Sequence, residues 1–144
     1  MKFTPTDPPR LFEVGQEAII KLEDCGRIEL APDEQVTFTT EGDGEYDVVR
    51  KSWGFYATPS MNRRLSRLGL YAALVKSPGG RTYLWLVENG KEEEFRAYVE
   101  LEKQKIICWL DSDEKIVALE TLLSGECNAE ETQRAVSVLS QSPL

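Results

Sequence analysis

The residues best suited to chemistry in this chain lie between positions 50 and 64. Arginines there stand close to aromatic and small polar side chains. A planar guanidinium group binds a carboxylate or a phosphate through parallel hydrogen bonds, so the pattern predicts a site for an anion. The predicted ligand-binding residues are Arg50, Trp53, Tyr56, Ser60, Asn62, Arg63 and Arg64.

The distribution of charge supports the same prediction. No Asp or Glu lies between Asp47 and Glu88, and residues 48–87 carry a net charge of +7. The rest of the chain holds 10 bases and 25 acids, a net charge of −15, and the whole chain carries −8. A positive patch on a negative protein attracts an anion locally. The alternative is that these arginines only cover a solvated helix face or pair with the acidic segments 41–47 or 91–94.

The aromatic residues beside the arginines admit two interpretations. Strand alternation predicts Trp53 and Phe55 on one face and Tyr56 on the other. Packing in a core explains most of the aromatic residues, and the alternative is a stacking platform for a nucleobase or a sugar ring. The net charge of −8 and the pI near 4.7 argue against a nucleic acid as the partner.

Several kinds of chemistry are excluded or disfavoured by composition. The chain has no histidine, which excludes Ser-His-Asp and Cys-His catalysis and histidine-based metal sites. Cys25, Cys108 and Cys127 are odd in number and widely spaced, so we expect three free thiols, with Cys108 in the core. Helix capping accounts for the acids at 111–114. We therefore expect neither a metal nor a cofactor.

No apolar run approaches the roughly 20 residues needed to cross a bilayer, and the first residues contain no apolar signal core. We therefore expect a cytoplasmic protein with no membrane partner.

The pattern of elements predicts an α+β fold. Residues 1–10, with three prolines, read as an extended arm, and residues 11–141 as a single α+β domain. Its β-rich part, 16–57, predicts an antiparallel sheet, as a partial sandwich or barrel, with turns at 24–26, 31–34 and 41–45. Its mixed α/β part, 60–141, predicts the order β-β-α-β-α-α with helices packed on the sheet.

Helix boundaries follow from capping residues. A first helix is predicted over 61–68 with Ser60 as its N-cap and Gly69 at its end. Later helices are predicted over 91–103, 113–125 and 128–141. Ser112 or Asp113 caps the second of these three, Gly125 ends it, and Asn128 caps the third.

The sequence favours a small non-catalytic binding protein that uses the patch around residues 50–67. The bound partner would be an anionic small molecule or the acidic surface of a protein, and a homo-oligomer is left open. One alternative is an enzyme without metal or histidine that acts on a phosphorylated or carboxylated metabolite through Tyr56, Ser60, Asn62 and Arg63. Another is an acidic mimic that inhibits a nucleic-acid-binding protein through segments 41–47 and 91–94.

Overall fold

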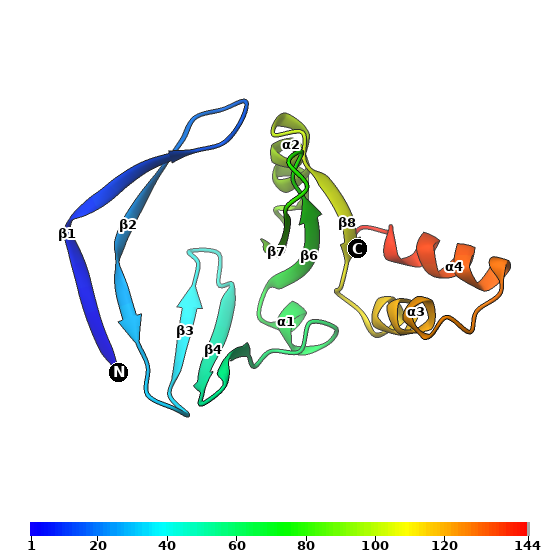
Figure 1. Ribbon diagram of the computed structural model, residues 1–144, viewed down its shortest axis with the longest axis horizontal. Coiled ribbons are helices and arrows are strands. Elements are labelled where there is room, and N and C mark those ends of the chain that lie inside the picture. The colour runs from blue at the N-terminus through cyan, green and yellow to red at the C-terminus, as the bar shows by residue number, and fades with distance from the viewer. Residues whose placement is uncertain (144) are drawn as a thin grey trace. The chain divides into compact units, whose positions relative to one another are not determined.

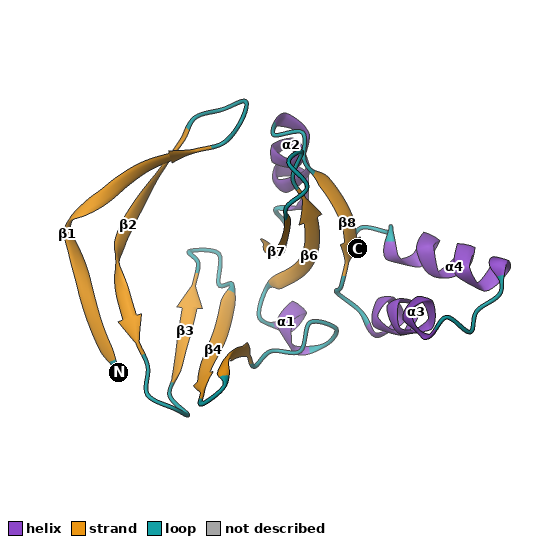
Figure 2. Ribbon diagram, viewed as in Figure 1, coloured by secondary structure: helices purple, strands orange, loops and turns teal. Residues whose placement is uncertain are grey.

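A computed structural model describes residues 1–143 and has an α+β fold, with three sheets and four helices in those residues (Figure 1, Figure 2). The chain divides into two compact units. The first unit comprises Met1–Phe38 and Asp47–Thr58, and the second comprises Thr39–Tyr46 and the described residues from Pro59 onward.

The first strands form a long antiparallel pair. Strand β1 (Lys2–Val14) pairs with β2 (Ile20–Glu29), and the register shifts between Pro5 and Arg10. Proline has no backbone N–H to donate to a partner strand, which accounts for the irregular pairing around positions 5 to 9. Most of the segment expected as an extended arm therefore belongs to strand β1.

The turn predicted at residues 24–26 is wrong, because these residues lie inside β2. Gly26 has a φ of 154° and pairs with Pro5. A Cβ atom at Gly26 would lie 2.6 Å from the carbonyl oxygen of Thr4 and 2.9 Å from the ring of Phe3. Glycine is required here by the close approach of β1, which a sequence pattern does not distinguish from a turn.

A second sheet has the strand order β3-β4-β5, formed by β3 (Gln35–Thr39), β4 (Glu45–Lys51) and β5 (Gly54–Ala57). The predicted turns at 31–34 and 41–45 are confirmed, except that Glu45 already begins β4. Strands β4 and β5 are antiparallel and are joined by a turn at residues 52 and 53.

The second unit is built on an antiparallel sheet of order β7-β6-β8. Its strands are β6 (Leu70–Lys76), β7 (Thr82–Glu88) and β8 (Lys105–Trp109). Its helices are α1 (Arg64–Arg67), α2 (Glu92–Leu101), α3 (Asp113–Ser124) and α4 (Ala129–Leu139). The predicted order β-β-α-β-α-α is confirmed.

The capping predictions for the last two helices are confirmed. Ser112 is the N-cap of α3, and its hydroxyl accepts a hydrogen bond from the backbone N–H of Lys115. Gly125 ends α3 in the left-handed conformation with a φ of 70°. Asn128 begins α4 in a reciprocal capping box with Glu131.

The central strand β6 is buried on both faces. Its residues alternate between two apolar clusters, so that Ala72 belongs to one and Ala73 to the other. The first cluster includes Leu65 together with Ala118 of α3 and Ala135 of α4. Phe95 of α2 packs against the second cluster, so helices cover both faces of the sheet. Cys108 lies in the first cluster, as expected for a core thiol.

Candidate functional site

The seven predicted ligand-binding residues fall in both units. Three of them belong to the first unit and lie on strands β4 and β5 or in the turn between them. The other four lie in or just before helix α1 of the second unit. The first group is Arg50, Trp53 and Tyr56, and the second is Ser60, Asn62, Arg63 and Arg64.

The β4–β5 hairpin exposes its aromatic side chains. Trp53, Phe55 and Tyr56 are 70%, 61% and 45% exposed, so packing in a core does not account for these three. The prediction that Trp53 and Tyr56 lie on opposite faces is wrong, because their rings stack with centroids 6.0 Å apart. Trp53 lies in the turn before β5, where the alternation of a strand does not apply.

The two cations of the hairpin, Lys51 and Arg50, have different partners. The ammonium group of Lys51 donates a hydrogen bond to Asp33, which raises the pKa of Lys51 above its ordinary value. The guanidinium carbon of Arg50 lies 5.6 Å from the ring centroid of Phe55, in a cation–π contact. Arg50 is half-buried and pairs with Phe55 in the strand register.

Helix α1 is shorter than the predicted helix 61–68. It spans Arg64–Arg67, and residues 61–63 form a turn. The N-cap of α1 is Arg63, so the prediction of Ser60 as the N-cap is wrong. The Ser60 hydroxyl still accepts a hydrogen bond of 3.1 Å from the backbone N–H of Arg64. A helix of four residues aligns few peptide dipoles, so α1 supplies little of the positive potential expected at its N-terminus.

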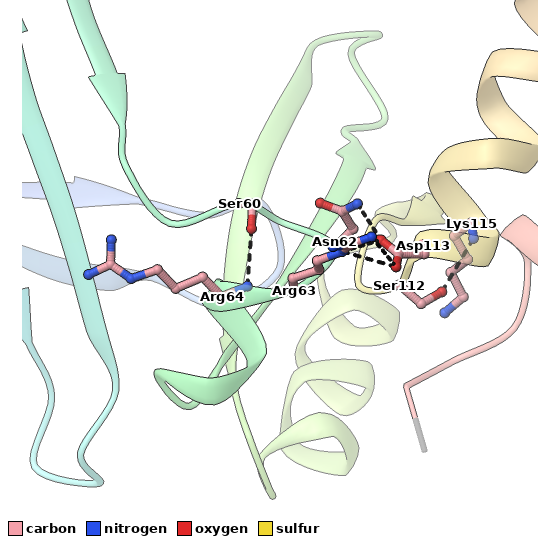
Figure 3. Close-up of polar contacts among 7 residues, drawn as sticks. All are labelled: Ser60, Asn62, Arg63, Arg64, Ser112, Asp113 and Lys115. Carbon is pink, nitrogen blue, oxygen red and sulfur yellow. Dashed lines mark hydrogen bonds and ion pairs between the residues drawn. The ribbon is translucent and has the colours of Figure 1, made fainter.

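Asn62 and Arg63 converge on a carboxylate from another part of the chain (Figure 3). The side-chain amide of Asn62 donates to Asp113 over 2.6 Å. The Nε and Nη2 atoms of Arg63 lie 3.0 Å from Oδ2 of Asp113, in a two-pronged pair. The Arg64 side chain points away from Asp113 in the same view.

This pairing shifts the pKa values of both charged groups. The hydrogen bond from Arg63 holds the pKa of Asp113 below its ordinary value, and the bond from Asn62 adds to the effect. The hydrogen bond to Asp113 raises the pKa of Arg63. The charge of Arg63 is therefore balanced within the chain. This agrees with the alternative in which an arginine pairs with an acid, although that acid lies outside segments 41–47 and 91–94.

Two residues at the start of α3 have roles that were not predicted from the sequence. The sequence predicts Asp113 mainly as a helix cap and less strongly as part of a carboxylate site, but Ser112 is the cap and the carboxylate of Asp113 binds Arg63. Lys115 is 5% exposed, and its ammonium group donates to Asp111 in a buried ion pair. Their i, i+4 spacing was a signal for this pair.

No three or more Cys, Asp or Glu side chains of residues 1–143 come together in a way that would hold a metal ion. Cys25, Cys108 and Cys127 are free thiols, and burial raises the pKa of Cys108. Within the same residues, no helix has the length and apolar character that a membrane span requires.

No family model, curated protein or solved structure matches this chain.

Proposed function

We propose that this is a non-catalytic binding protein whose β4–β5 hairpin docks onto an acidic surface of a protein partner. The observation that carries the proposal is the exposure of Trp53, Phe55 and Tyr56 on one short hairpin. Aromatic residues and arginine are enriched in the parts of protein interfaces that contribute most to affinity. The expected compartment is the cytoplasm, where thiols remain reduced.

Charge favours an acidic partner. Residues 48–57 of the hairpin belong to the acid-free segment 48–87, whereas the start of β4 contains Glu45 and Asp47. The guanidinium group of Arg50 lies against the ring of Phe55. The rest of the chain is strongly acidic. An acidic contact site on a partner is therefore attracted to the hairpin and repelled by the other parts of this chain. This arrangement contributes to the specificity of docking.

The contacts of the second group of predicted residues weigh against the enzyme alternative. Asn62 and Arg63 direct donors to Asp113, and the Ser60 hydroxyl accepts from the backbone of Arg64. Polar groups that are engaged within the chain have less capacity to bind and orient a substrate. The hairpin of the first unit is therefore the stronger part of the predicted patch.

Affinity capture with matched baits tests the proposal. Wild-type protein, Trp53→Ser and Tyr83→Ser would each be used to capture proteins from a lysate of the source cells. Tyr83 is the control, because it is an aromatic residue with 41% exposure that lies on β7 in the second unit. We expect at least one protein to bind wild type and Tyr83→Ser but not Trp53→Ser.

The captured protein would then be purified and titrated. Loss of a central interface tryptophan typically costs at least about 2 kcal/mol, so Trp53→Ser should weaken the complex by about 30-fold or more. Cross-links from the hairpin should reach a segment rich in Asp and Glu. Identical captured proteins from all three baits, or a contact segment without acids, would contradict the proposal.

A further inference from the structure

The first unit contains a cavity whose residues come from four strands or their ends. Its volume is about 610 Å³, which falls within the range of small-molecule sites in proteins. Two arginines, Arg27 of β2 and Arg50 of β4, line it. Apolar surface is supplied by Ile28, Leu30 and Phe55. All of these residues belong to the same compact unit.

Arg50, which lines this cavity, has one buried and unsatisfied donor. Its Nη1 atom is buried and has no hydrogen-bond partner in residues 1–143. A buried donor on a charged group that lacks a partner is costly, and an acceptor that bonds to it recovers that cost. The contact with Phe55 holds the guanidinium group in place, so little conformational freedom is lost when a ligand binds.

The charges of the cavity favour an anion. Arg27 and Arg50 contribute two positive charges, and the only acidic side chain in the lining is Glu29, which leaves a net charge of +1. The cavity therefore combines a guanidinium fork with an apolar wall. A carboxylate attached to an apolar or aromatic body matches both features, whereas a bare inorganic anion matches only the first.

We propose that this cavity binds a small organic carboxylate, with its oxygens on Arg50 and Arg27 and its apolar body against Phe55, Ile28 and Leu30. The inference goes beyond the proposed docking function, because the ligand is a small molecule and Arg27 has no part in that docking. Glu29 limits affinity for a dianion, because it repels the second charge.

Calorimetric titration with 2-naphthoate tests the inference. Wild type should bind it at submillimolar concentration, and binding should weaken as salt is added. The uncharged 2-naphthamide and inorganic phosphate should each bind at least about tenfold more weakly, because each lacks one of the two features. Glu29→Gln should strengthen the binding of 2-naphthoate, since it removes the opposing charge.

Variants of the arginines decide the assignment. Arg50→Met and Arg27→Met should each weaken binding of 2-naphthoate by at least about tenfold, since each removes hydrogen bonds to a charged group. Arg81→Met is the control, because Arg81 is an exposed arginine of the second unit. Arg27 is also exposed, so Arg27→Met keeps the test decisive if Arg50→Met fails to fold.

Three outcomes would overturn the inference: no binding of 2-naphthoate to wild type at millimolar concentration, equal binding of the acid and its amide, or unchanged binding by Arg27→Met. Trp53→Ser separates the two proposals. It should weaken docking of the protein partner by about 30-fold or more and leave binding of 2-naphthoate unchanged, because Trp53 does not line the cavity.

Discussion

The buried ion pair at the start of α3 allows a sharp prediction about stability. The side chains of Lys115 and Asp111 are only 7% and 9% exposed, and the ammonium group of Lys115 donates to the carboxylate. Lys115→Met keeps most of the side-chain volume but leaves Asp111 as a buried charge without its cation. Breaking a buried pair in this way costs about 3–5 kcal/mol. For a chain of this size that corresponds to a fall in Tm of about 6–20 °C.

A double-mutant cycle that includes Asp111→Asn alone separates this cost from a simple loss of packing. Asp111→Asn combined with Lys115→Met removes both charges, so the double variant should be more stable than Lys115→Met alone. Lys91→Met is the control, because the Lys91–Glu94 pair is exposed and should contribute little. Urea unfolding followed by circular dichroism measures all the variants. A loss of less than about 1 kcal/mol by Lys115→Met, or a double variant no more stable than Lys115→Met, would show that the buried pair does not have this role.

Two further predictions concern titratable groups. The pKa of Asp113 is lowered in the folded protein, so this carboxylate stabilises the fold at pH values above its unfolded pKa, and the effect is lost as pH falls through the folded value. Thermal melts of wild type and Asp113→Asn should therefore differ at neutral pH and converge in acid; a difference that stays constant with pH would contradict this. Native thiol titration should modify exposed Cys25 quickly and buried Cys108 slowly, because burial raises the pKa of Cys108. Denaturation without reductant should release three thiols, and a count of one would reveal a disulfide.

Local chemistry determined the elements of the second unit. The helix ends depend on residues that act close to their own positions. Ser112 and Asn128 accept hydrogen bonds from backbone N–H groups at helix starts, and Gly125 adopts the left-handed conformation at a helix end. The turn at residues 77–81 joins the neighbouring strands β6 and β7, so this hairpin also depends on residues close together in the sequence. The order of strands and helices after residue 69 followed directly from these signals.

Pairing between distant strands was decided only by the tertiary structure. Gly26 resembles a turn residue in the sequence, yet it lies inside β2 because Thr4 and Phe3 of β1 approach it closely. Residues 1–10 carry prolines typical of a loose arm, but part of the segment gains hydrogen bonds from β2. These contacts join residues 14 to 27 positions apart, and no local pattern encodes them.

The sequence determined that an acid-free, arginine-rich segment exists, because charge is a property of each residue. Only the fold decided which arginines pair with an acid of the same chain and which can bind an anion from outside it. Asp113 lies 50 residues from Arg63 and neutralises it through a pair that spacing along the chain does not indicate. Arg27 lies outside the acid-free segment and lines the same cavity as Arg50 because both residues belong to one compact unit. Coulombic and hydrogen-bond energies depend on distance in space, and the fold sets that distance.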